Sequence, residues 1–277
     1  MVTRFAPSPT GLLHRGHALS AFLAHDAAHD AGRAAGGRFL LRIEDIDTAR
    51  CRREFATAML EDLAWLGLTW DGPVVFQSER RAAYAAALDQ LRERRLLYRC
   101  FRTRAEVAAA IGQAPHEPET PFFSEPLSAK NEAARLAEGA PFAWRLSIAA
   151  AEKALGGFTD LAFVDAERGR IAADPRAAGD VVLARKDLGV AYHLAVAVDD
   201  AAQGVTLVVR GEDLLGACHI QRLLQALLGL PTPAYRHHRL VLGADGKRLA
   251  KRDKSQTLGT LRAGGMTPKQ LRAELGL

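Results

Sequence analysis

Apolar residues along the first fifty positions follow two different periods. A short apolar run from Val2 to Ala6 predicts a strand, which ends at the prolines and glycine that follow it. Beyond His14 the apolar residues recur at the spacing of one helix face, at Leu19, Phe22, Leu23 and Ala27. Residues 38–43 then predict a second buried strand. Because strand–helix–strand units are nearly always right-handed and parallel, the carboxyl ends of these two strands should lie side by side.

The rest of the chain continues in helices and strands. Helical periodicity predicts helices over residues 52–66, 79–97, 213–228 and 269–275, and apolar runs predict strands over 74–76, 142–146, 205–211 and 237–242. The segment from 147 to 178 is typical of short strands and turns. Trp65 and Trp70 are expected in the core, and Thr267 with Pro268 is expected to open the last helix. The alternation favours an α/β fold around a parallel sheet.

Composition narrows the class of protein without naming a function. The 277 residues are 48% hydrophobic and 25% charged, which suits a soluble globular chain. The net charge of +5 is compatible with nucleic-acid binding but does not demonstrate it. No signal peptide and no apolar run of membrane-spanning length is visible, so we expect no membrane association. Cys51, Cys100 and Cys218 are scattered, which favours the reducing cytoplasm.

The first candidate chemistry lies where the first helix begins. The sequence His14-Arg15-Gly16-His17 would place two ring donors beside the backbone N–H groups and positive dipole of a helix N-terminus, where a phosphate can bind. Gly16 leaves room for a flat ring to approach the backbone. The functional interpretation is an ATP site at the end of a parallel sheet. The alternative is a turn that carries two surface histidines.

Acidic residues follow the second strand. Arg4 and Glu44 could face one pocket, where the guanidinium would bind a carboxylate and Glu44 would accept hydrogen bonds from an ammonium group. The alternative is that Glu44, Asp45 and Asp47 only cap the next helix. We assign capping to Asp47 and the pocket to Glu44.

Two blocks resemble a known family. Arg4-Phe5-Ala6-Pro7-Ser8-Pro9-Thr10-Gly11 followed by His-x-Gly-His resembles the first signature of the glutamyl-tRNA synthetases, which are class I aminoacyl-tRNA synthetases. Residues 41–47 resemble the second conserved block, with Ile46 where Thr is usual. The resemblance implies that His14 and His17 stabilise charge during catalysis. It also implies ATP contacts from Pro7, Thr10, Gly11, His14, Gly16 and His17, and a glutamate contact from Ser8 beside those of Arg4 and Glu44.

A basic segment near the C-terminus completes the family's ATP signature. Lys247-Arg248-Leu249-Ala250-Lys251-Arg252 resembles the Lys-Met-Ser-Lys-Ser loop, with Arg248 at the first Lys and Ala250 at the Ser. The resemblance implies that Arg248, Leu249 and Lys251 bind ATP and that Lys251 is catalytic, because a flexible cation can follow the charge that builds on the α-phosphate. The alternative is a solvated basic run.

Two further residues are candidates for glutamate binding. Tyr192 and Arg210 are expected on separate elements that return to the sheet, and both stand in the order in which the family carries them, together with Asp180, Asp199 and Asp200. The resemblance implies that Tyr192 donates its hydroxyl and that Arg210 binds a carboxylate. The alternatives are a core aromatic for Tyr192 and an ion pair with Glu212 or Asp213 for Arg210.

The chain departs from the family at a metal site. Many relatives carry Cys-x-Cys here as the beginning of a zinc site, whereas this chain has Cys100 and then Arg102. Zinc requires about four N or S ligands, so we expect no structural zinc and no protein metal site. The proline-rich run 115–121 predicts a loop, in the region where class I synthetases carry a domain inserted near the acceptor end of RNA.

The family resemblance implies a domain plan. We expect a Rossmann-type parallel sheet formed by residues 1–98 and 179–235, an inserted α+β subdomain at 99–178, and a lysine loop with short C-terminal helices at 236–277, without an anticodon-binding domain. This catalytic half most resembles the glutamyl-queuosine tRNA(Asp) synthetases. That resemblance implies a ligase that uses ATP with Mg²⁺ to activate L-glutamate and transfers it to queuosine in the anticodon loop of tRNA(Asp). A monomer is favoured.

Three alternatives remain open at this point. One is a minimal glutamyl-tRNA synthetase that charges a tRNA 3′ end, and another is a non-catalytic relic that only binds tRNA. The third is an adenylyltransferase for a different small molecule, which the combination of Arg4, Glu44 and Arg210 disfavours.

Overall fold

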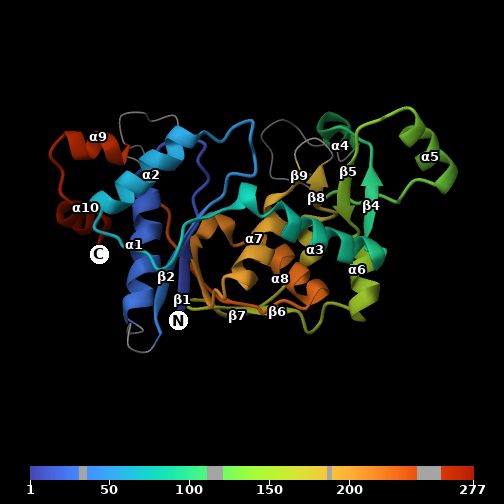
Figure 1. The fold of residues 1–277 in the computed structure, drawn as a ribbon. Helices are drawn as coiled ribbons and strands as arrows, with labels where there is room; N and C mark the ends of the chain where they lie inside the picture. The colour runs from blue at the N-terminus through green and yellow to red at the C-terminus, as the bar shows by residue number, and fades with distance from the viewer. Residues whose placement is uncertain (31–35, 111–120, 186–188, 242–256) are drawn as a thin grey trace.

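The N-terminal sheet is the parallel unit that the sequence predicts. The computed structural model describes residues 1–30, 36–110, 121–185, 189–241 and 257–277 (Figure 1). Strands β1 (Val2–Phe5), β2 (Arg38–Ile43) and β3 (Val75–Phe76) form a parallel sheet in the order β1-β2-β3. Helix α1 (Arg15–Asp30) connects β1 to β2, and α2 (Arg53–Trp65) follows β2. Trp65 and Trp70, predicted in the core, are partly buried and pack against it.

A second parallel set of strands lies beside β1. Strands β10 (Leu207–Gly211) and β11 (Ala234–His238) pair in parallel, and β11 pairs with β6 (Ala162–Asp165), which in turn pairs with β7 (Gly169–Ala172). The Thr206 backbone N–H donates to Val2 O at 2.9 Å, which places β10 next to β1. Since the chain leaves β1 for β2 on one side and β10 lies on the other, the carboxyl end of β1 is a topological switch point.

An antiparallel sheet forms the far end of the molecule. It has the order β4 (Leu97–Cys100), β5 (Ala143–Leu146), β8 (Val182–Arg185) and β9 (Gly189–Val190). Helices α4 (Arg104–Ala110), α5 (Ala129–Ala137) and α6 (Ile148–Leu155) lie around it. Strands β4 and β8 both pair with β5, so one sheet joins the two sides of the expected insertion at 99–178. The domain division itself stays a prediction.

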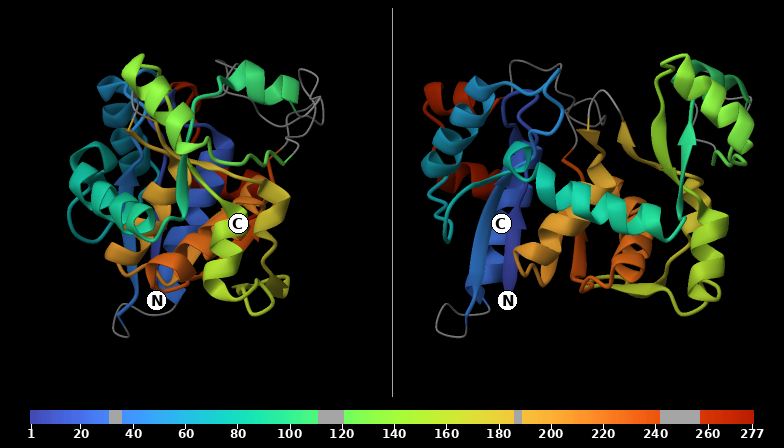
Figure 2. Two further views of the ribbon diagram at one scale, coloured as in Figure 1. Left: turned by 90° about the vertical axis from the view of Figure 1, so that its right-hand side faces the viewer. Right: turned by 45° about the vertical axis from the view of Figure 1, so that its right-hand side comes forward.

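Three helices join the two ends of the molecule. Helix α3 (Arg81–Glu93) runs across from the N-terminal sheet towards β4, and α7 (Tyr192–Ala202) and α8 (Ala217–Leu228) pack beside it (Figure 2). Leu223, Leu224 and Leu227 of α8 are almost completely buried in the larger hydrophobic core. Among the described helices, none has the length and apolar character needed to cross a membrane.

The C-terminal helices dock on α1. Thr267 forms a capping box with Gln270 at the start of α10 (Pro268–Leu275), which confirms the predicted opening by Thr267 and Pro268. Ion pairs Arg15–Glu274 and Arg272–Asp26 join α10 to α1. Helix α9 (Leu258–Ala263) begins after Thr257, whose neighbour Leu258 donates its N–H to Leu13 O at 2.8 Å. The C-terminal segment therefore closes against the turn that precedes α1.

Several sequence predictions were wrong in detail. The strand predicted at 237–242 is β11, which runs from Ala234 to His238. It begins earlier than predicted, because Ala234 and Tyr235 already pair with β10. The helix predicted from Asp213 begins at Ala217, after a 3₁₀ turn at Glu212–Leu214. Helices α5 and α6 were not predicted. Residues 115–120 of the predicted loop lie outside the described residues.

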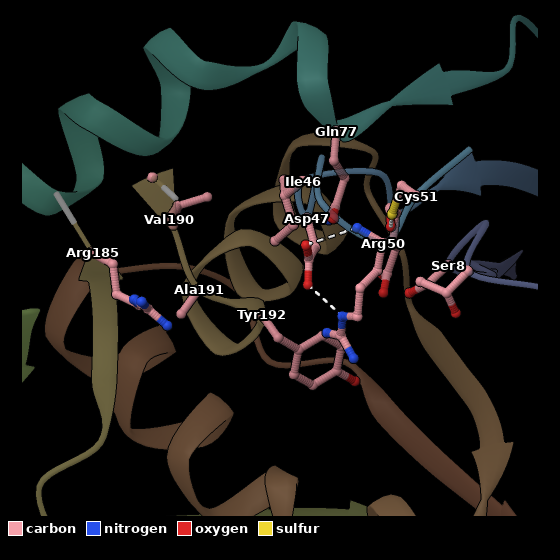
Figure 3. A pocket seen from close by; sticks show the side chains of 13 residues that line it. Ser8, Ile46, Asp47, Arg50, Cys51, Gln77, Arg185, Val190, Ala191 and Tyr192 are labelled. Carbon is pink, nitrogen blue, oxygen red and sulfur yellow. Dashed lines mark hydrogen bonds and ion pairs between the residues drawn. The ribbon is translucent and has the colours of Figure 1, made fainter. Parts of the chain in front are cut away.

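Asp47 does not cap a helix. Its Oδ2 accepts from Arg50 Nε at 2.6 Å and its Oδ1 from the Arg50 backbone N–H at 3.3 Å, which closes the turn before α2 (Figure 3). Helix α2 has Arg52 at its N-cap, without a side-chain capping bond. The predicted capping role was therefore wrong, because the turn intervenes between Asp47 and the helix.

Candidate active site

Two connected cavities open at the carboxyl ends of β1, β2 and β10. The inner cavity, about 620 Å³, lies between the turn after β1, the start of α1 and the end of β10. The entrance cavity, about 530 Å³, lies between the segment after β2 and the start of α7 (Figure 3). Ser8, Glu44 and Tyr192 line both cavities and form the boundary between them. The two cavities therefore adjoin along these three side chains.

The structure gathers most of the residues predicted for the site. Those that line the inner cavity are Arg4, Pro7, Ser8, His14, Gly16, His17, Glu44, Tyr192 and Arg210. Thr10 lines the entrance cavity, and Gly11 lines neither of the two. Arg248, Leu249 and Lys251 lie outside the described residues, so their roles stay predictions.

The two histidines are held at the N-terminus of α1. His14 Nδ1 accepts from the Gly16 N–H at 3.1 Å, and His17 Nδ1 accepts from the His14 N–H at 3.2 Å. A neutral imidazole that accepts at Nδ1 carries its proton on Nε2, so each ring keeps a donor there. The ring that approaches Gly16 is that of His14, since a Cβ on Gly16 would lie 3.1 Å from His14 Cε1. A larger residue at position 16 would therefore require the His14 ring to shift by a few tenths of an ångström.

A buried ion cluster supports the floor of the cavities. Arg42 is fully buried on β2, where its NH1 donates to Asp200 Oδ1 at 2.8 Å and its NH2 to Glu44 Oε1 at 3.1 Å. Burial opposes ionisation of Arg42, but the surrounding carboxylates outweigh it and raise the pKa of this residue. Asp199, the neighbour of Asp200 on α7, accepts from Arg80 Nε at 2.6 Å. Together with Arg4, these guanidinium groups offset the carboxylates of the cluster.

Arg4 and Glu44 both belong to this cluster and both face the inner cavity. Arg4 Nε donates to Asp200 Oδ1 at 3.1 Å. Burial raises the pKa of Glu44, although Arg42 and Arg4 act against that shift. The carboxylate of Glu44 is thus fixed from below by Arg42 and presented at the boundary of the two cavities.

Arg210 is held differently, because no carboxylate pairs with it among the described ion pairs. Its Nε donates to His237 Nε2 at 3.2 Å and its NH2 contacts Cys218 Sγ at 2.8 Å. The side chain is 5% exposed, and its NH1 is buried with no hydrogen-bond partner. A buried charge without a counter-ion is costly. The inner cavity, which Arg210 lines, is the place from which an anion could pair with it.

A chain of hydrogen bonds orients Arg210. His237 Nδ1 lies 2.6 Å from Asp165 Oδ2, so the imidazole proton sits on Nδ1 and the lone pair on Nε2 accepts from Arg210. Burial lowers the pKa of His237, and Arg210 acts in the same direction, against the raising effect of Asp165. Burial opposes ionisation of Asp165, but His237 and two backbone N–H groups lower the pKa of this residue below its ordinary value.

The alternatives proposed for Tyr192 and Arg210 can now be compared with the structure. Tyr192 is the first residue of α7, not part of a strand, and it lines both cavities. Burial raises the pKa of its hydroxyl, so the proton is retained as a hydrogen-bond donor. Glu212, an expected partner of Arg210, instead accepts from Arg168 NH2 at 3.3 Å.

Sequence reasoning missed the supporting residues. Arg42, Asp165 and His237 are buried polar side chains inside or at the ends of strands. The available signal was a charged or ring residue within an apolar run, as with Arg42 in residues 38–43. In the part of the chain that is described, no three His, Cys, Asp or Glu side chains form a group that could hold a metal. Cys100 packs with Tyr98 and Phe122 instead.

A parallel α/β sheet with histidines at the first helix and a basic pocket at its switch point defines a class of nucleotide-binding, substrate-activating domain. The family model for the class I tRNA synthetase catalytic domain (E and Q) matches residues 1–277. The chain belongs to this family, whose members are ligases.

Several known proteins are similar to the chain. The glutamyl-Q tRNA(Asp) synthetase of Rhodobacter capsulatus is 48% identical over the whole of both chains, and that of Nocardia farcinica is 48% identical over 98% of this chain and 82% of its own. Glutamate–tRNA ligase 2 of Nitrosococcus oceani is 38% identical over 97% of this chain but only 57% of its own length.

A solved structure shares the architecture. The glutamate tRNA ligase of Elizabethkingia meningosepticum, solved in complex with its amino acid, superposes with a TM-score of 0.73 at 29% identity. The match covers 91% of this chain and 52% of that ligase, so the present chain spans about half of its length. The Rossmann-type α/β fold expected from the sequence is confirmed.

Proposed function

We propose that this protein activates L-glutamate with ATP and transfers the glutamyl group to queuosine in the anticodon loop of tRNA(Asp). The similarity to the Rhodobacter capsulatus protein of that name, which extends over the full length of both chains, supports the choice of acceptor. The class I family supports the use of ATP.

The observation that carries the choice of amino acid is the buried, unpartnered NH1 of Arg210. The side-chain carboxylate of glutamate would complete this ion pair as a charge-assisted hydrogen bond. Glu44, at the boundary of the cavities, supplies a carboxylate for the ammonium group, and Tyr192 supplies a hydroxyl donor. Arg4 lines the same cavity and is fixed by Asp200. A dicarboxylic amino acid fits this arrangement of charges.

Activation needs position and charge stabilisation, with no acid or base. An oxygen of the α-carboxylate attacks the α-phosphorus of ATP, a P–O bond forms, and pyrophosphate leaves with the electrons of the broken bond. The Nε2 donors of His14 and His17 are placed to stabilise charge on the phosphate oxygens. We expect Mg²⁺ to enter on the phosphates of ATP and neutralise part of their charge. Lys251 is proposed to follow the departing pyrophosphate.

Transfer then uses a hydroxyl of the queuosine cyclopentenediol. Its oxygen attacks the glutamyl carbonyl carbon, an ester bond forms, and AMP leaves with the electrons of the broken C–O bond. The hydroxyl proton passes to a phosphate oxygen of the departing AMP. The entrance cavity is the proposed route by which this hydroxyl approaches.

The test is transfer of labelled glutamate to tRNA(Asp) with and without queuosine. Labelling only of the queuosine-containing tRNA supports the proposal, provided that periodate treatment of the diol abolishes it while the tRNA 3′ end is protected. Labelling of tRNA(Glu) at its 3′ end would make the protein a minimal glutamyl-tRNA synthetase, in line with its likeness to the Nitrosococcus oceani ligase. If neither labelled tRNA nor glutamyl-adenylate forms, the proposal that this protein is a glutamate-activating enzyme is refuted.

A further inference from the structure

A third cavity adjoins the entrance cavity on the side away from the histidines. This side cavity, about 520 Å³, lies between α3 and the antiparallel sheet, with Arg81, Tyr84 and Leu88 on one wall and Phe142 and Trp144 on the other. It shares with the entrance cavity the residues Ile46, Arg185, Gly189 and Val190. It shares no lining residue with the inner cavity. The three cavities therefore form a series, with the entrance cavity in the middle.

The sheet wall of the side cavity is a row of paired residues. Arg99, Trp144, Ala184 and Val190 are successive cross-strand partners on β4, β5, β8 and β9. Directly paired residues point to the same face of a sheet. Trp144, Ala184 and Val190 therefore form a continuous surface, and all three line the cavity.

Arg99 and Phe142 hold the ring of Trp144 in place. The Arg99 guanidinium carbon lies 4.5 Å from the centroid of the Trp144 ring, and Arg99 forms an ion pair with Glu132 of α5. The Phe142 ring meets the Trp144 ring edge to face at 5.6 Å. These contacts hold a large aromatic surface in place at the cavity, where it is half-buried. Such a preorganised ring costs little further ordering when a flat ligand stacks on it.

The lining matches the chemistry of a nucleotide in a single-stranded RNA segment. Aromatic rings stack unpaired bases, and arginines bind the phosphates on either side. The side cavity offers Trp144 and Phe142 for stacking and the exposed Arg81 for a phosphate. The base of ATP is a poorer occupant, because His14 and His17 place its phosphates in the inner cavity, beyond the entrance cavity.

We infer that the side cavity binds the base of the acceptor nucleoside, turned out of the RNA loop and stacked on Trp144. Its hydroxyl then reaches the entrance cavity, where Glu44 and Tyr192 border the site of activation. This inference rests on the proposed function and adds the place where the RNA acceptor binds. It separates two steps in space: activation depends on the inner cavity, and transfer depends on all three.

The test measures the two steps separately in Trp144→Ala, Trp144→Phe and Ala85→Trp. Ala85 is an exposed residue of α3 that lines the side cavity, so a tryptophan there fills the cavity without changing the core. We expect Trp144→Ala to raise KM for queuosine-containing tRNA(Asp) roughly ten- to hundredfold, the range for loss of one stacked base, and Trp144→Phe to restore most of it. Glutamate-dependent ATP–pyrophosphate exchange should change less than about twofold in all three.

A matched control and a binding assay keep the test decisive. Phe123→Ala removes an exposed aromatic of the same region that does not line the cavity, and it should leave transfer unchanged. Unchanged transfer in both Trp144→Ala and Ala85→Trp overturns the inference, as does a parallel loss of exchange and transfer that phenylalanine does not restore. If the wild-type protein shows no exchange, the proposed function fails, and the side cavity is still tested by tRNA affinity. Equal affinity of wild type and Trp144→Ala then overturns it.

Discussion

Asp165 orients the Arg210 guanidinium through His237, although Asp165 itself does not line the inner cavity. Its Oδ1 accepts from the backbone N–H groups of Glu167 and Arg168, both at 3.0 Å, and its Oδ2 from His237 Nδ1 at 2.6 Å. In Asp165→Asn the amide oxygen will stay with the two backbone donors. The NH₂ group then replaces the Oδ2 atom, which accepts from the His237 backbone N–H at 3.3 Å as well as from His237 Nδ1. The backbone N–H loses its acceptor, and Nδ1 can only accept.

This change reverses the imidazole tautomer. A proton on His237 Nε2 would face Arg210 Nε, so two donors would oppose each other where a 3.2 Å hydrogen bond now holds the guanidinium. A hydrogen bond that involves a charged group contributes about 1.5–3 kcal/mol. Since about 1.4 kcal/mol is a factor of ten, KM for glutamate should rise roughly 10- to 100-fold, and kcat should fall less.

The assay is glutamate-dependent ATP–pyrophosphate exchange at saturating ATP. Glu167→Gln, which alters an exposed neighbouring acid, should behave like wild type. The thermal transition of each variant reports whether the fold is intact. A folded Asp165→Asn protein with an unchanged KM for glutamate would refute the role assigned to the Asp165–His237–Arg210 chain.

Three further predictions concern stability. Burial raises the pKa of Asp62 from 3.8 to about 6, so stability is lost as the pH rises through that range and the cost is complete above it. Asp62→Asn should therefore stabilise the protein by up to about 2 kcal/mol at pH 8 and not at pH 4, as measured by urea unfolding, and equal effects at the two pH values would contradict this. Burial lowers the pKa of His193 to about 4, so stability is lost as the pH falls from 6.5 to 4. His193→Gln should remove up to about 3 kcal/mol of that loss, and a variant with the same pH profile of stability as wild type would contradict this. Thr267→Ala should cost about 1 kcal/mol and speed amide exchange in α10, whereas unchanged exchange there would argue against the cap.

The sequence by itself determined the elements whose residues lie close together along the chain. The strand at 38–43, the helix after His14 and the cap at Thr267 follow from local periodicity and capping chemistry, and each is present. The sequence also predicted that Arg4 and Glu44 face one pocket, and both line one cavity, because a right-handed βαβ unit brings the ends of neighbouring parallel strands together.

Only the tertiary structure decided how the site is supported and where a second ligand can bind. Arg210 meets His237 and Asp165 because β10, β11 and β6 are neighbours, although residues 165 and 237 stand far apart in the chain. The side cavity exists because a helix from the N-terminal half faces a sheet whose strands come from 97 to 190. Such contacts depend on strand order and register, which local sequence patterns do not encode.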